Sequence, residues 1–217
     1  MTEHVPVPLN PHGVTVPSDR ITHKLDYYTD KTPPPGTIMW KAEWCVEKYE
    51  DTPSAAVRAG VATPTEVRHV MGNVLTYGGG DILWLGAKNG LTATTGAANT
   101  FFDNSNAAII VGSSGAAAVA SDTDLSASTD TDREAAGMEA TYPTHTTGNN
   151  STANLDISFR SVFSTAIANF AWEEWGITNT TKSSAPLAGR LLNRKAEALG
   201  TKTSAATWTF TCKLSLS

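Results

Sequence analysis

Two tryptophans and two glutamates stand together as Trp172-Glu173-Glu174-Trp175, and of all the residues in the chain these are the most suggestive of chemistry. Two carboxylates about 5–9 Å apart across one cleft can cleave a glycosidic bond as an acid and base pair. In a strand, however, successive side chains point to opposite faces, which places Trp172 with Glu174 and Glu173 with Trp175. The two glutamates then cannot flank one bond, although one of them with a distant partner stays an alternative. The pattern favours a structural strand covered on both faces, by its own core and by another layer or subunit.

Two other groups of residues could bind a phosphate or a metal ion. The run Gly78-Gly79-Gly80 lacks the Gly-Lys-Ser/Thr ending of a phosphate loop and favours a tight turn or close backbone packing. Alternate acids in a loop can bind calcium, but the glycine and glutamate that an EF-hand requires are missing, which favours turn and cap roles. These acids are Asp122, Asp124, Asp130 and Asp132.

The histidines form no recognisable catalytic motif. They are His4, His12, His23, His69 and His145, and neither an HExxH pattern nor a nucleophile elbow surrounds any of them. No serine, cysteine or aspartate nucleophile stands beside a candidate base. We therefore expect a protein that is not an enzyme, with no catalytic residue, no cofactor and no metal.

The elements that position these residues begin with an unusual N-terminal segment. Residues 1–35 hold seven of the 11 prolines, including the run Pro33-Pro34-Pro35. Proline removes amide donors and favours extended geometry in the residue before it. The sequence predicts an extended arm over 1–35 that binds along a neighbouring molecule, followed by a β-rich structural domain over 36–217.

Period-two alternation predicts several half-buried strands in this domain. After Gly36, the residues Ile38, Trp40, Ala42, Trp44 and Val46 fall on one face, with Lys41, Glu43 and Glu47 on the other. The same alternation marks residues 155–160 and the stretch from Trp208 to Leu216, and we expect Trp208 to lie in the core.

The segments between these strands are less regular. The sequence predicts a loop over 51–68, a short helix over 74–87 and a short buried strand over 106–114. Residues 121–136 are polar and rich in turn residues, with a possible capping box at Thr131 and Glu134. Together these elements predict a mainly β protein: an antiparallel β-sandwich or jelly-roll-like body with one or two short helices and an extended N-terminal arm.

Composition limits the classes of function. The 217 residues carry a net charge of −5, and 17% are charged, below the roughly 25% usual for a soluble domain. Without a cluster of Lys and Arg, direct nucleic-acid binding is not expected. Without a long apolar run or a signal-peptide pattern, neither a membrane span nor secretion is expected. Cys45 and Cys212 are predicted to be reduced and strand-borne.

Several phrases, taken in order, resemble a known group of proteins. They are Gly72-Asn73-Val74-Leu75, Tyr77-Gly78-Gly79, Phe102-Asp103-Asn104-Ser105-Asn106-Ala107, Val111-Gly112, Gly137-Met138-Glu139-Ala140-Thr141-Tyr142-Pro143, Phe159-Arg160-Ser161-Val162-Phe163, Ala168 to Gly176, Leu192-Asn193-Arg194-Lys195 and Leu199-Gly200-Thr201-Lys202-Thr203 leading to Trp208. In this order and spacing, residues 70–217 resemble a family of structural proteins from tailed bacteriophage virions. The resemblance implies a β-rich virion component and supplies no catalytic residues.

The resemblance implies a structural role with two alternatives, and the tryptophans and glutamates suggest a third function from a different class. The first is a capsid decoration (cement) protein that binds the major capsid protein or other virion proteins, assembles in the host cytoplasm, and forms a trimer or higher homo-oligomer or lateral self-contacts. The second is a neck or tail component such as a tail tube, collar or fibre-attachment protein, and the third is a carbohydrate-binding module. Candidates for core-strand or interface positions are Trp40, Trp44, Trp172, Glu174, Trp175, Trp208, Pro33, Pro34 and Pro35.

Overall fold

A computed structural model describes residues 39–89, 102–145, 156–181, 185, 187 and 189–216. The chain divides into two units, residues 1–37 and residues 38–217, and every described residue belongs to the second. The predicted arm, with Pro33, Pro34 and Pro35, lies outside the described residues.

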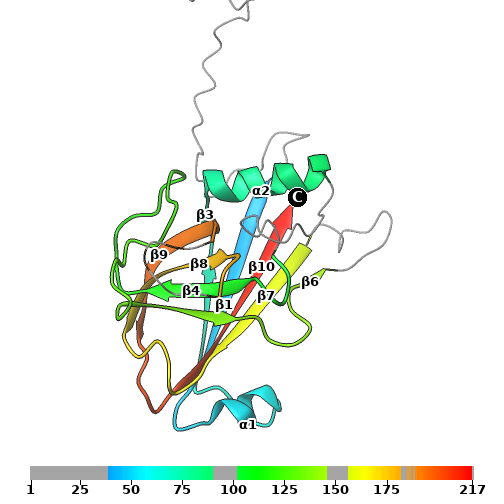
Figure 1. The fold of residues 1–217 in the computed structure, drawn as a ribbon. Helices are drawn as coiled ribbons and strands as arrows, with labels where there is room; N and C mark the ends of the chain where they lie inside the picture. Colours follow the sequence, from blue (N-terminus) through cyan, green and yellow to red (C-terminus); the bar gives the residue numbers. More distant parts are fainter. Residues whose placement is uncertain are drawn as a thin grey trace, which may run out of the picture. The chain divides into compact units, whose positions relative to one another are not determined.

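The described unit consists of two five-stranded antiparallel sheets that face each other (Figure 1). Sheet A has the order β2 (Glu66–Met71), β1 (Trp40–Tyr49), β10 (Thr207–Leu216), β7 (Asp156–Phe163) and β6 (Thr144–His145). Sheet B has the order β3 (Val74–Leu75), β9 (Leu191–Thr201), β8 (Ala171–Thr178), β4 (Ala108–Gly112) and β5 (Arg133–Gly137). Helices α1 (Ser54–Arg58) and α2 (Tyr77–Asn89) lie at opposite ends of the sandwich. The prediction of a mainly β, antiparallel sandwich with short helices is confirmed.

The strands predicted from alternation form the centre of sheet A. Strand β1 pairs along its whole length with β10, from Trp40 opposite Leu216 to Tyr49 opposite Thr207. Its even-numbered residues Ala42, Trp44 and Val46 are buried in the core, as the alternation predicts, because one face of the sheet is covered by sheet B.

Aromatic rings from both sheets meet in the core. Trp172 of β8 packs edge-on against Phe163 of β7 and Trp208 of β10, with ring centroids 4.6 and 4.7 Å away. Phe210 of β10 lies 5.1 Å from Trp44 and 5.4 Å from Trp175. Such pairs contribute about 0.5–1.5 kcal/mol each beyond the area they bury, so this cluster is a main link between the sheets.

The predicted alternation of Trp172-Glu173-Glu174-Trp175 is wrong. Trp172 and Trp175 both lie in the core between the sheets, and only Glu174 is buried on the other side of β8. The cause is an irregularity: the pairing of β8 with β9 shifts register between Trp172 and Glu174. A register shift breaks the period of two, so two bulky rings three positions apart can enter the same core.

Three further segments differ from the prediction. The expected loop over 51–68 contains α1, which begins after Pro53, and the start of edge strand β2. The expected capping box at Thr131 and Glu134 starts no helix, because Arg133–Gly137 pairs with β4 as strand β5. Strand β9 was not predicted at all, since its burial on both faces and two register shifts leave no simple alternation in its sequence.

The predicted helix over 74–87 begins later than expected, at Tyr77, because Val74 and Leu75 pair with β9 as strand β3. Thr76 stands between the two elements, where its hydroxyl accepts a hydrogen bond from Gly79 N at 3.0 Å and donates one to the Leu191 carbonyl. This is a helix cap that also ties α2 to β9. Gly79 lies against the Leu192 backbone, so the glycine run provides the predicted close packing.

Candidate functional site

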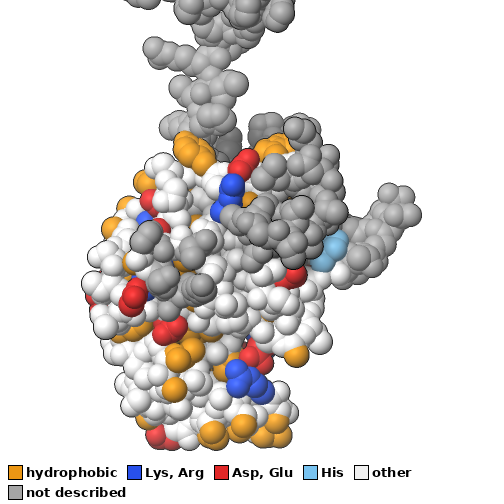
Figure 2. All heavy atoms as spheres, in the orientation of Figure 1, with side chains coloured by type: hydrophobic (Ala, Val, Ile, Leu, Met, Phe, Trp, Pro, Cys, Tyr) orange, Lys and Arg blue, Asp and Glu red, His pale blue; other side chains and the backbone are white. Residues whose placement is uncertain are grey.

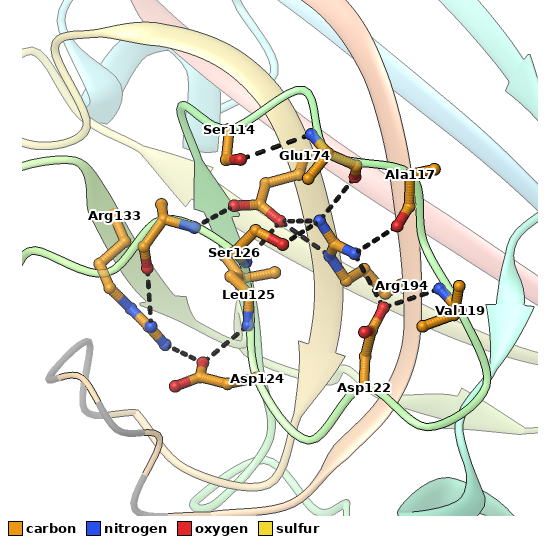
Figure 3. Close-up of polar contacts among 12 residues, drawn as sticks. Ser114, Ala117, Val119, Asp122, Asp124, Leu125, Ser126, Arg133, Glu174 and Arg194 are labelled. Atoms are coloured by element: carbon orange, nitrogen blue, oxygen red, sulfur yellow. Dashed lines mark hydrogen bonds and ion pairs between the residues drawn. The ribbon is translucent and has the colours of Figure 1, made fainter.

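The most highly charged buried region of the described chain lies on the outer face of sheet B. Residues 113–132, here called the covering loop, connect β4 to β5 and lie over this face. Glu174 of β8 and Arg194 of β9 project from the strands toward the loop, and both side chains are almost fully buried (Figure 3). The layer predicted to cover the second face of β8 is therefore part of the same chain.

Glu174 is saturated with hydrogen-bond donors. Its carboxylate accepts from Ser126 N at 2.9 Å and from Ala127 N at 2.6 Å, and Arg194 Nε donates to it at 2.7 Å. Gly112 makes room for this carboxylate, because a Cβ at that position would lie 2.8 Å from Glu174 Oε1. A buried carboxylate with this set of donors is held in one orientation, which is a structural role.

Arg194 extends the network into the covering loop. Its guanidinium donates to the carbonyls of Ala116 at 2.8 Å and Ala117 at 3.2 Å, and to Ser126 Oγ at 2.8 Å. Asp122 Oδ2 accepts from the same guanidinium at 2.8 Å. One buried cation therefore fixes several points of the loop, and the planar fork of arginine suits this task better than lysine would.

A second ion pair holds the end of the same loop. The guanidinium of Arg133, fully buried at the start of β5, pairs with Asp124 and donates to the Ala127 carbonyl at 3.1 Å. Asp124 also accepts from the backbone N–H of Leu187 at 2.7 Å. Each arginine thus has its own aspartate, and the two pairs lie side by side under the loop.

The four aspartates considered for calcium are engaged separately. Asp122 and Asp124 pair with arginines, Asp130 accepts from the N–H of Ala185, and Asp132 accepts from Thr129. Within the described residues, which include all four, no group of three or more acidic, His or Cys side chains is arranged to hold a metal ion. The acids act as ion-pair partners and turn acceptors.

Another buried charge lies at the other end of β8. Lys202 is nearly inaccessible, and its Nζ donates to the carbonyls of Ser164 at 2.7 Å and Ile167 at 3.0 Å and to Asn169 Oδ1 at 2.8 Å. Burial lowers the pKa of Lys202 to about 8, partly opposed by the charge of Glu50. The ammonium therefore stays protonated at neutral pH and holds the turn that leads into β8.

The two cysteines lie on neighbouring strands but face opposite ways. Cys212 is buried in the core beside Trp44, whereas Cys45 is on the outer face of sheet A, opposite Thr211. Burial raises the pKa of both thiols, well above the ordinary value for Cys212. Both are free thiols of low reactivity, which agrees with the predicted reduced state.

The predicted site residues do not form one site. Trp44, Trp172, Trp175 and Trp208 meet in the core, while Trp40 lies at its edge and donates from Nε1 to Asn73 Oδ1 at 3.0 Å. Only Glu174 joins the buried network, where Arg194 is its ion-pair partner, while Arg160 pairs with Glu47 on the other sheet.

Sequence reasoning missed the exposed apolar residues of α2 and β2. Tyr77 and Trp84 of α2 are 72% and 76% exposed, and Val67 and Met71 of β2 are 47% and 59% exposed. Tyr77 and Trp84 stand seven positions apart, two helical turns, so they share one face of α2. That spacing was visible in the sequence, but only the structure shows that this face is not the buried one.

Comparisons with protein-family models, with curated proteins and with solved structures give no match to this chain. The resemblance to bacteriophage structural proteins therefore stays a prediction. No described helix is both long enough and apolar enough to cross a membrane.

Proposed function

We propose that this protein is a non-enzymatic structural component of a bacteriophage virion, a capsid decoration protein that binds the major capsid protein shell. The observation that carries the proposal is the placement of its exposed apolar side chains. Of the eight large apolar residues exposed in the described chain, five lie on α2 and β2: Val67, Met71, Tyr77, Leu83 and Trp84. Exposed apolar residues concentrated on two elements, rather than scattered singly, fit a surface that contacts another protein.

Three other properties support the proposal. The ordered phrases between residues 70 and 217 resemble virion structural proteins. On the face drawn in Figure 2, the described atoms are mainly backbone and uncharged polar side chains with few charged groups, which suits lateral packing. The carboxylate of Glu174, one of the two glutamates considered for catalysis, is buried and fully engaged in holding the covering loop.

Quantitative mass spectrometry of purified particles of the encoding virus tests this function. A decoration protein is expected at a copy number comparable to that of the major capsid protein, because it follows the symmetry of the shell. A small copy number set by one ring would overturn decoration in favour of a neck or tail part. Absence of the chain from particles would overturn the virion role itself.

A carbohydrate-binding module is the second candidate, and Tyr77 and Trp84 are the observation that favours it. Exposed aromatic rings on one face of an element can stack on sugar rings through their apolar faces. Glycan-array binding by the purified chain, lost in both Tyr77→Ala and Trp84→Ala, would support this alternative. An array with no binding would leave the virion role as the better account.

A further inference from the structure

Among the described residues, strand β2 is an open edge of the sandwich. Sheet A ends at β2 and β6, and sheet B ends at β3 and β5. Strands β3 and β6 have two residues each, and beyond β5 the chain forms a bridge between Met138 and Ser161 of the other sheet. Within the described residues, β2 is therefore the one edge strand longer than two residues whose chain does not continue into a bridge with the opposite sheet. An open edge is a template for pairing with another strand.

The hydrogen-bonding pattern between β2 and β1 shows which backbone groups of β2 face outward. Gly72 N donates to Ala42 O at 2.8 Å, and residues 72 and 42 continue the register in which Met71 lies opposite Glu43. In an antiparallel ladder such pairs alternate, so the even-numbered residues of β2 bond to β1. The N–H and C=O groups of Val67, His69 and Met71 consequently point to the free edge. Among the described residues, their one hydrogen-bond partner is Lys195 Nζ, 3.2 Å from Met71 O.

The side chains of the same three residues lie together on the outer face of sheet A. Val67, His69 and Met71 are all exposed and lie opposite the outer-face residues of β1. Natural edge strands are commonly protected by charged residues or proline at such positions. Here an apolar residue stands two positions on either side of His69, so the pattern is nearly symmetric about this residue.

We propose that two copies of this chain pair antiparallel through β2, across a two-fold axis at His69. This register places Val67 opposite Met71 twice and forms about six backbone hydrogen bonds, two for each outward-facing pair. It places Glu66 opposite Gly72 and Arg68 opposite Val70, so no like charges face each other. The two five-stranded A sheets become one continuous sheet, in an isologous contact that uses the same surface on both copies.

The small area of the contact limits its affinity. A six-residue edge buries much less than the roughly 1,600 Å² of a typical stable interface. The pairing is therefore weak in dilute solution and becomes effective where copies are held close together, since effective concentration strengthens a weak contact. This inference depends on the fold alone and holds whether or not the protein is a capsid component.

Disulfide trapping in the full-length chain tests the register. Across the axis, outward-facing paired residues have Cα atoms about 5.5 Å apart, within the range that a disulfide bridges. The test variant is His69→Cys with Cys45→Ser, because Cys45 lies opposite His69 on β1 and would otherwise capture the new thiol. The matched collision control is Val119→Cys with Cys45→Ser, at a residue that is 51% exposed and lies in the covering loop.

We expect the His69→Cys variant to form covalent dimers at least about tenfold faster than the Val119→Cys control, because pairing raises the local thiol concentration. Adding Val67→Lys and Met71→Lys should remove the difference, whereas adding Val61→Lys should not. Equal rates for the two cysteine variants would overturn the proposal.

Sedimentation velocity of the chain with its own cysteines, without any introduced cysteine, gives a second, independent measurement. A dimer that grows with concentration and disappears in Val67→Lys/Met71→Lys is expected, with thermal unfolding used to confirm that the variant is folded. If the unaltered chain stays monomeric up to millimolar concentration, β2 does not pair with itself. A strand of a different protein would then be its occupant.

Discussion

At the scale of single residues, the buried Glu174 carboxylate is the side chain whose chemistry matters most to the fold. Every neighbour of its two oxygens is a donor: Ser126 N, Ala127 N and the Arg194 guanidinium. An amide in its place would present an NH₂ group to one of these donors and remove the charge that balances Arg194. The shape would be conserved while the hydrogen bonding would not.

We expect Glu174→Gln to lower the free energy of unfolding by about 3 kcal/mol, the low end for a broken buried ion pair, because Asp122 still balances Arg194. Urea unfolding measures the effect. Glu173→Gln is the matched control on the adjacent, partly exposed residue, and it should change stability by less than about 0.5 kcal/mol. Equal effects of the two changes would contradict the structural role assigned to Glu174.

Lys202 makes the stability of the folded state depend on pH in a defined direction. Its folded-state pKa of about 8 lies below the ordinary value of 10.5, so the folded state binds this proton more weakly than the unfolded state does. The contribution of Lys202 to stability is therefore smallest below pH 8 and increases as the pH rises toward 10.5. NMR titration of the Lys202 side chain should show a midpoint near 8. Lys213 is the control, because its hydrogen bond to Asp156 raises its pKa above the ordinary value.

At the scale of elements, the attachment of α2 to β9 depends on the absence of a side chain at Gly79. A Cβ there would overlap the Leu192 backbone, whereas a Cβ at Gly80 would meet no atom within 4 Å. Alanine at Gly79 therefore tests the effect of close packing, whereas alanine at Gly80 tests the effect of helix propensity alone.

Gly79→Ala should destabilise the protein by about 1–3 kcal/mol, because overpacking outweighs the better helix propensity of alanine. Gly80→Ala should instead stabilise it by about 0.5–1 kcal/mol, since only the propensity changes. Thermal unfolding of the two variants measures both effects. A gain in stability from both would mean that α2 does not contact β9 as closely as described.

At the scale of the whole molecule, the aromatic core joins the two sheets, and residues 1–37 are a unit separate from residues 38–217. Trp208 contributes to this core from β10 and also lies under the ammonium of Lys48, whose Nζ is 4.6 Å from the ring centroid. We therefore expect substitutions in the core to affect folding, and removal of residues 1–35 to affect attachment to particles.

Trp208→Ala should lower the free energy of unfolding by about 3–5 kcal/mol, as large-to-small changes in a packed core do. Trp84→Ala, at a residue that is 76% exposed, is the matched control and should be nearly neutral. Denaturant unfolding followed by circular dichroism distinguishes the two. A neutral Trp208→Ala would mean that the core between the sheets is not the main source of stability.

Removal of residues 1–35 should leave the thermal unfolding of the body nearly unchanged and weaken its attachment to particles. The reason is that the body forms its own compact unit from residue 38 onward. Calorimetry of the shortened chain and a co-sedimentation assay with particles measure the two effects. A large decrease in melting temperature would show that the arm contributes to folding.

The sequence by itself determined the strands in which apolar and polar residues alternate, because this alternation is a property of one strand alone. Successive residues of a strand point to opposite faces whatever the strand pairs with, so the alternation around Trp44 and Trp208 was enough to place both in the core. The glycine run was likewise predicted from its own residues to provide close backbone packing, and Gly79 does so against Leu192.

Only the tertiary structure decided which distant residues meet. Trp172 and Trp175 share one core because of a register shift between β8 and β9, and a shift depends on the partner strand rather than on either sequence alone. Glu174 meets Arg194 because β8 and β9 are neighbours in sheet B. The covering loop then buries this pair, although its composition is that of an exposed loop. Long-range pairing follows from strand order, and strand order is not a local property of the chain.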